Sequence, residues 1–306
     1  MSHSSPDALQ QRCQQIVTSP VLSPEQKRPF LALEAENNLP YPALPEAARA
    51  ALDEGFICDM FEGHAPYKPR YVLPDYAKFL ANGSEWLELE GAKDLDDALS
   101  LLTILYHHVP SVTSMPVYLG QLDALLQPYV RILTQEEINS RIKRFWRYLD
   151  RTLPDAFMHA NIGPEDTPVT RAILRADAEL KQVAPNLTFI YDPAITPDDL
   201  LLEVAKNICE CSKPHICNAP VNDKIFTKGH YGVVSCYNSL PLAGGGSTLV
   251  RLNLKTIAEH STSMEDFLSR ALPHYCQQQM AIIDARCDFL YQQSGFFENS
   301  FLVKEG

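Results

Sequence analysis

The sequence predicts an α/β protein with a mainly helical N-terminal region, and three observations support this prediction. Apolar residues recur at helical spacing in the first part of the chain, most clearly over 94–107. A strand pattern at 186–191 is followed by a helical pattern from 196 to about 211. Two further β-branched runs, 231–235 and 248–254, lie on either side of a turn-rich segment.

Each helix of the first half has a local signal. Ser23-Pro24-Glu25-Gln26 has the form of a capping box, with proline at the first helical position. Ser19-Pro20 ends the helix before it. The predicted helices are 6–18, one starting at Ser23, 45–54, 94–107, 121–130 and 134–149.

The second half adds strands. The segment Asn186-Leu-Thr-Phe-Ile-Tyr191 has the β-branched and aromatic content of a strand. The predicted strands are 186–191, 213–218, 231–235 and 248–254, and a long helix over 264–289 is interrupted near Pro273. We therefore predict two regions, a mainly helical one over 1–115 and an α/β one over 116–306.

Composition excludes several classes of protein. The formal net charge is -12, from 38 acidic and 26 basic residues, which argues against a nucleic-acid-binding face. No apolar run approaches the ~18 residues of a membrane span, and the N-terminus has no secretory pattern. We expect a cytoplasmic protein with no membrane contact, whose eight cysteines are thiols.

Cys236 is the leading candidate for a catalytic residue. The run Tyr231-Gly-Val-Val-Ser-Cys-Tyr-Asn delivers this cysteine from a strand into a turn, and three glycines follow at 244–246. A loop cysteine commonly acts as a thiolate beside a histidine, and His230 is six residues upstream. A thiyl radical is the other possibility. The glycines lack the lysine of a phosphate-binding loop, so we interpret them as slack that lets Cys236 reach inward.

Three segments resemble glycyl radical enzymes. Gly232-Val-Val-Ser-Cys-Tyr-Asn-Ser-Leu-Pro-Leu is similar to the cysteine loop of pyruvate formate-lyases and anaerobic ribonucleotide reductases. Ala184-Pro-Asn-Leu-Thr-Phe-Ile resembles a barrel strand of these enzymes, and Val117-Tyr-Leu-Gly-Gln-Leu-Asp with Pro128-Tyr129 resembles a further segment. Over residues 7–306 the chain most resembles the YjjI family of glycyl radical enzymes.

The resemblance implies a fold and a chemistry. It implies part of a ten-stranded α/β barrel, in which Cys236 becomes a thiyl radical and abstracts hydrogen from a small-molecule substrate. The radical glycine of this family lies in an Arg-Val-x-Gly-aromatic setting, which this sequence lacks. We therefore expect an N-terminal portion whose missing C-terminal portion carries that glycine. A radical SAM activase would install the radical, this chain would bind no cofactor itself, and a homodimer is left open.

Two other segments supply candidate substrate-binding residues. If 213–218 is the strand before the cysteine loop, His215 or Asn218 faces the barrel interior, depending on strand register. Strand alternation places His159 and Asn161 on one face, where they would orient substrate; the alternative is a solvent-facing loop start before Gly163-Pro164.

A metal site is not predicted. Cysteine and histidine cluster in the second half, but their spacing, Cys-x-Cys-x3-His-x-Cys, matches no common zinc pattern. The cluster comprises Cys209, Cys211, His215 and Cys217.

Three alternatives to a radical enzyme fragment stay open. They are a truncated and catalytically inactive chain, a fragment related to anaerobic ribonucleotide reductases, and a thiolate enzyme that uses Cys236 with His230 or His215. Because a partial barrel leaves strand edges unpaired, we expect the isolated chain to self-associate.

Overall fold

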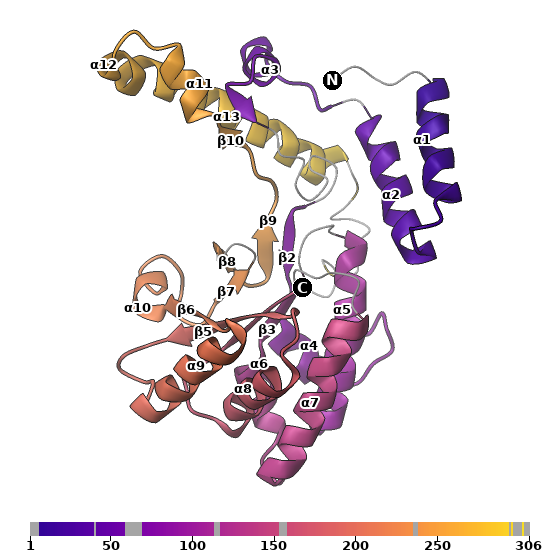
Figure 1. The fold of residues 1–306 in the computed structure, drawn as a ribbon, viewed down its shortest axis with the longest axis vertical. Coiled ribbons are helices and arrows are strands. Elements are labelled where there is room, and N and C mark those ends of the chain that lie inside the picture. Colours follow the sequence, from indigo (N-terminus) through magenta and orange to yellow (C-terminus); the bar gives the residue numbers. More distant parts are fainter. Residues whose placement is uncertain are drawn as a thin grey trace. The chain divides into compact units, whose positions relative to one another are not determined.

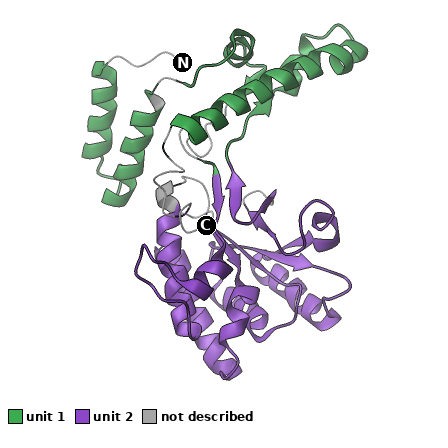
Figure 2. Ribbon diagram, turned by 180° about the vertical axis from the view of Figure 1, so that it is seen from behind, with its two compact units in different colours: residues 1–70, 247–296 green, residues 71–246, 297–306 purple. Residues whose placement is uncertain are grey.

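The chain divides into two compact units, coloured separately in Figure 2. In this computed structural model, the described residues are 6–39, 41–58, 69–112, 117–152, 158–234, 238–293, 295 and 302. Unit 1 comprises residues 1–70 and 247–296, and unit 2 comprises residues 71–246 and 297–306. Each unit therefore joins segments that are far apart in the sequence.

Unit 1 is mainly helical, with one short antiparallel strand pair. Strand β1 (Ile57–Cys58) pairs with β10 (Arg251–Leu252). Its helices are α1 (Pro6–Thr18), α2 (Pro24–Asn37), α3 (Glu46–Asp53), α11 (Leu254–Glu259), α12 (Met264–Asp266), α13 (Leu272–Asp288) and the π-helical turns Phe267–Ala271 and Phe289–Gln293. A small apolar core holds α3, β1 and α13 together, with Ile57 and Ile282 almost fully buried.

Two predictions for unit 1 are confirmed at atomic detail. Ser23 accepts from the Gln26 main chain while the Gln26 side chain accepts from the Ser23 main chain, so the capping box is complete. The long C-terminal helix is interrupted near Pro273, where the π-helical turn Phe267–Ala271 precedes α13. Pro273 has no N–H to donate to the preceding turn, and the Leu272 N–H just before it bonds to the Phe267 carbonyl in the π-helical pattern.

Unit 2 is built around a sheet of four parallel strands in the order β3-β4-β5-β6. These strands are β3 (Tyr118–Gln121), β4 (His159–Ile162), β5 (Asn186–Tyr191) and β6 (His215–Asn218). Two antiparallel pairs accompany the sheet: β7 (Tyr231–Val234) with β8 (Asn238–Pro241), and β2 (Tyr71–Leu73) with β9 (Gly244–Gly246). The fold is therefore mixed α/β, as the sequence predicts.

Helices follow each strand of the sheet except β6, where a single helical turn comes next. The helices of unit 2 are α4 (Tyr76–Asn82), α5 (Leu95–Val112), α6 (Leu122–Leu126), the 3-10 turn Gln127–Tyr129, α7 (Gln135–Thr152), α8 (Pro168–Leu180), α9 (Asp198–Cys211) and α10 (Ala219–Asn222). Figure 1 shows α8 and α9 on one side of the sheet and the β7–β8 hairpin on the other. The alternation of strand and helix thus leaves one sheet face for the helices and the other for the hairpin.

The helix-covered face carries the main hydrophobic core. Ala160, Leu187 and Phe189 of the strands pack in one cluster with apolar residues of α5, α7, α8 and α9. Helix α5 lies in this unit although we predicted residues 71–115 as part of an N-terminal helical region. Its apolar side chains, such as Leu102 and Leu105, are buried in this core, which accounts for its place there.

Two local interpretations of the sequence are wrong. The glycines 244–246 are not loop slack, because they form β9 and pair with 71–73. A Cβ atom at Gly245 would lie 2.0 Å from the main-chain oxygen of Tyr71, so glycine permits this close pairing. The strand predicted over 248–254 is limited to Arg251–Leu252.

A buried ion pair lies between the sheet and the helices. The Lys213 Nζ donates to Asp177 Oδ1 at 2.8 Å, and both side chains are almost fully buried. Trp146 and Asn207 also donate to the Asp177 carboxylate, at 3.2 and 3.0 Å. This network joins α7, α8 and α9 to the segment that leads into β6. Among the helices that the structure describes, none is long and apolar enough to cross a membrane.

Candidate functional site

The sheet face opposite the helices is polar, and it forms the candidate site. Strand register places Asn161 beside Thr188, and Thr188 beside His215, on three neighbouring strands. His159 lies two residues before Asn161 and so points to the same face. These residues thus form a row of polar side chains across β4, β5 and β6.

His159 and Asn161 are buried residues of a strand. Their exposed fractions are 2% and 1%. The alternative of a solvent-facing loop start is therefore wrong, because β4 lies between β3 and β5 and is covered by other elements on both faces. Their shared face was predicted correctly from alternation.

The β7–β8 hairpin packs on this polar face. Val233 of β7 is 1% exposed and packs with Ile190 of β5 and Tyr231 in a small apolar cluster. Val234 pairs with Asn238, so the two strands are in register up to the three residues that join them. Cys236 is the middle one of these three and lies outside the described residues.

Asn161 bonds to the main chain of the hairpin. Its Oδ1 accepts from the Val233 N–H at 2.8 Å, and its Nδ2 donates to the Val233 carbonyl at 2.9 Å. The Tyr118 hydroxyl donates to the same Oδ1 at 3.2 Å. We predicted that Asn161 orients substrate; in the structure, two of its three hydrogen bonds described here go to β7 and the third to Tyr118.

Burial controls the charge of this face. Burial, together with a smaller electrostatic effect of His215, lowers the pKa of His159 to about 4. Burial also raises the pKa of Tyr118 and, to about 12, that of Tyr231. At neutral pH His159 and both phenols are therefore uncharged hydrogen-bonding groups.

His215 and Asn218 both lie in β6, the last strand of the described sheet. Both are exposed, and they are three residues apart, so alternation points them to opposite faces. His215 shares the polar face with Thr188, whereas Asn218 pairs in register with Tyr191 on the helix side. The structure thus brings His159, Asn161 and His215 together and separates Asn218 from them.

Sequence analysis missed Thr188 as a candidate ligand contact. It is 1% exposed, and its hydroxyl oxygen has no hydrogen-bond partner in the described part of the chain. A buried hydroxyl with no partner is costly, so it is a natural contact for a ligand or water. The signal was present, because Thr188 lies in the Pro-Asn-Leu-Thr segment that carries the family resemblance.

His230, the proposed thiolate partner, lies at the wrong end of the hairpin. Its carbonyl accepts from Leu242, just beyond the pair formed by Tyr231 and Pro241. The residues that join the strands follow Val234, so the length of β7 separates them from His230, about 13 Å at 3.3 Å per residue.

Two cavities lie elsewhere on unit 2. One, of about 400 Å³, lies at the carboxyl ends of β3 and β4 and is lined by Gln121, Asp123 and Arg131, among others. Asp123 accepts from Gly163 and Thr170 at 2.6 and 2.8 Å, and burial raises its pKa to about 6. The carboxylate is thus used mainly to join β3 and β4 to α8.

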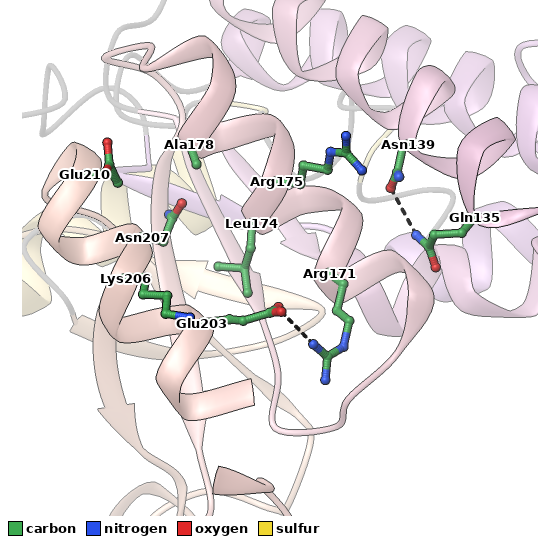
Figure 3. Close-up of a pocket in the computed structure, with 10 residues that line it drawn as sticks. All are labelled: Gln135, Asn139, Arg171, Leu174, Arg175, Ala178, Glu203, Lys206, Asn207 and Glu210. Carbon is green, nitrogen blue, oxygen red and sulfur yellow. Dashed lines mark hydrogen bonds and ion pairs between the residues drawn. The ribbon is translucent and has the colours of Figure 1, made fainter. Parts of the chain in front are cut away.

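The second cavity is a groove of about 420 Å³ among α7, α8 and α9 (Figure 3). Arg171 on its wall pairs with Asp166, Asp199 and Glu203 at 2.6–2.8 Å. Because its cation is matched by carboxylates, this groove offers little net charge to an ionic ligand. Among the described residues, no group of three or more His, Cys, Asp or Glu side chains could hold a metal ion.

Comparison with known proteins defines the class. The family model described as "Glycyl radical enzyme YjjI-like" matches residues 22–306. The chain therefore belongs to the YjjI-like family of glycyl radical enzymes, as the three sequence segments indicated.

Two curated relatives place the chain within this family. It is 88% identical over all 306 residues to the "Uncharacterized protein YjjI" of Escherichia coli (strain K12), of which the match covers 59%. It is 45% identical over 258 residues, 83% of this chain, to an "Uncharacterized protein" of Haemophilus influenzae, of which the match covers 49%. The chain thus spans only about half to three fifths of the relatives it matches.

Proposed function

We propose that this chain carries the cysteine half of a glycyl radical active site, with Cys236 as the residue that abstracts hydrogen from substrate. A glycyl radical takes the hydrogen atom of the Cys236 thiol, which leaves a closed-shell glycine and a thiyl radical. The thiyl radical then takes hydrogen from a substrate carbon, which regenerates the thiol and leaves a substrate radical.

One observation carries this proposal: the hairpin that bears Cys236 is anchored over the buried polar side chains His159, Asn161 and Thr188 of a parallel sheet, and His159 is uncharged at neutral pH. Reactive radicals need a site from which water is excluded. Neutral His159, together with the Thr188 hydroxyl, supplies hydrogen bonds without strong acids or bases. The position of His230 at the base of the hairpin favours this chemistry over a thiolate that uses His230.

The other parts of the site are proposed from the family. The four-stranded sheet would be part of a ten-stranded barrel, and the radical glycine would lie in the part of the longer relatives that this chain does not match. A radical SAM activase would generate the radical, and the substrate would be a small molecule.

A test is available that needs no knowledge of the substrate. The intact protein is activated anaerobically by its activase in D₂O and followed by electron paramagnetic resonance. Thiol hydrogens exchange with solvent, so reversible transfer between Cys236 and the glycyl radical would replace the Cα hydrogen by deuterium. The proton splitting of the glycyl signal should then collapse in the wild type and persist in Cys236→Ala.

Other outcomes would reject the proposal. A Cys236→Ala variant whose splitting collapses as fast as that of the wild type would exclude the thiol as the hydrogen carrier. Failure to form any glycyl signal with an active activase would favour an inactive chain. Rapid alkylation of Cys236 by iodoacetamide at neutral pH, with activity in air, would favour the thiolate enzyme.

A further inference from the structure

The side chain of Asn161 replaces a neighbouring strand for one residue of the hairpin. Its amide donates to the carbonyl of Val233 and accepts from the N–H of the same residue, at 2.9 and 2.8 Å. This is the two-bond pattern by which one residue pairs with another across an antiparallel ladder. Both residues are 1% exposed, so water cannot replace either bond.

Tyr118 fixes the orientation of this amide. Its hydroxyl donates to Asn161 Oδ1, which assigns that atom as the acceptor and leaves Nδ2 to face the Val233 carbonyl. Tyr118 is itself fixed by α4, because the Tyr76 hydroxyl donates to the Tyr118 main-chain carbonyl. A chain of hydrogen bonds therefore runs from α4 through β3 and β4 to β7.

The packing beside this contact leaves little room for a side chain at Gly232. A Cβ atom at Gly232 would lie 2.5 Å from the Tyr118 ring carbon Cζ. The absence of a side chain lets β7 approach the sheet closely enough for the Asn161 amide to reach Val233.

We propose that Asn161 is a positioning residue that fixes β7, the strand that leads to Cys236, on the sheet. Val233 is three residues before Cys236, and Val234 closes the last described pair of the hairpin with Asn238. Asn161 therefore holds the last described residues of β7 before Cys236. This role rests on the proposed function of Cys236, but the two hydrogen bonds between Asn161 and Val233 can be tested without radical chemistry.

The test compares Asn161→Asp with wild type in the full chain. The aspartate keeps an acceptor for the Val233 N–H but places a second oxygen against the Val233 carbonyl, so that bond becomes a repulsion. We expect amide exchange at Val233, measured by hydrogen–deuterium exchange with mass spectrometry, to accelerate about tenfold or more. The rate at which a thiol reagent modifies Cys236, measured in the same samples, should change by a similar factor.

A matched control separates positioning from general loss of stability. Asn207 is also buried, and its Nδ2 donates to the Lys213 carbonyl and to Asp177 on the helix side of the sheet. Asn207→Asp should destabilise unit 2 without a selective effect on Val233 or Cys236. If Asn161→Asp does not fold, Tyr118→Phe removes the hydrogen bond from the Tyr118 hydroxyl to Asn161. This variant should give a smaller change in the same direction in Val233 exchange and Cys236 labelling.

The outcomes distinguish this inference from the proposed function. Wild-type exchange at Val233 together with a wild-type labelling rate at Cys236, in a folded Asn161→Asp or Tyr118→Phe variant, would overturn the positioning role. Selective release of Val233 in these variants supports the role. It does so even if the D₂O experiment finds that Cys236 exchanges no hydrogen with a glycyl radical.

Discussion

Replacing Lys213 by methionine should unfold unit 2 far more readily than an ordinary surface substitution. The Lys213 Nζ donates to Asp177 Oδ1 and to the Gln182 carbonyl at 2.8 Å, and to the Pro185 carbonyl at 3.1 Å. The Asp177 side chain is 0% exposed. Methionine fills a similar volume but supplies neither the charge nor the three donors.

The expected cost follows from what Lys213→Met leaves behind. The Asp177 carboxylate would keep Trp146, Asn207 and Cys211 as donors but lose its cation in a site that water cannot enter. Breaking one side of a buried ion pair typically costs about 3–5 kcal/mol. We expect a loss of that size in the free energy of unfolding.

Lys143→Met is the matched control. The Lys143–Glu179 pair has the same 2.7–2.8 Å geometry as the buried pair, but its side chains are 40% and 37% exposed. An exposed pair of this kind contributes about 0–1 kcal/mol. The two variants differ in burial rather than in the chemistry of the substitution.

Urea unfolding followed by tryptophan fluorescence provides the assay. Trp146 is fully buried and bonds to Asp177, so its emission reports on this region. The midpoint should shift strongly in Lys213→Met and little in Lys143→Met, with similar slopes. Equal shifts in the two variants would refute the reasoning, because burial would then have no bearing on the value of the pair.

Four further predictions concern packing, pH and association. Gly232→Ala should cost about 1–3 kcal/mol in urea unfolding because its methyl group meets the Tyr118 ring, and an unchanged midpoint would contradict the close approach. Gly245→Ala should lower the free energy of unfolding by at least as much, because its Cβ would lie 2.0 Å from the Tyr71 main-chain oxygen and φ is +153°. A Tm equal to that of the wild type, measured by calorimetry, would contradict the pairing of β9 with β2. The pKa of His159 is lowered from 6.5 to about 4, so the unfolded chain binds a proton between these values that the folded chain does not. The free energy of unfolding should therefore fall by up to about 3 kcal/mol as pH drops from about 6.5 to 4, and His159→Leu should lose this part of the pH dependence. If unfolding titrations give the wild type and His159→Leu the same pH dependence, His159 is not its source. Finally, the isolated 306-residue chain should self-associate through unpaired strand edges. Elution as a compact monomer in size-exclusion chromatography would contradict this.

Local signals in the sequence predicted most elements that depend on neighbouring residues. The strand Asn186–Tyr191 has the predicted limits, because five consecutive apolar or β-branched residues after Asn186 suit a strand covered on both faces. The helix Pro6–Thr18 also has its predicted limits, since Ser19-Pro20 ends it. Such features are encoded within a few residues of one another.

Long-range pairing could not be predicted in this way. The partner of the glycines 244–246 is the segment 71–73, more than 170 residues earlier, and nothing near the glycines indicates it. The same holds for Asn161, whose alternation with His159 was clear but whose bonds go to Val233, 72 residues later. A side chain can be assigned to a face from sequence, whereas its partner depends on which element covers that face.

The division of the chain into units has a consequence for synthesis. Unit 1 needs β1 and β10, which are separated by roughly 190 residues of sequence. At about 5–20 residues per second, its first segment leaves the ribosome about 10–40 s before its second segment exists. The continuous stretch that makes up most of unit 2 can fold in that interval, so nascent residues 1–70 must wait with their apolar side chains exposed. These residues are where a chaperone would be expected to bind the growing chain.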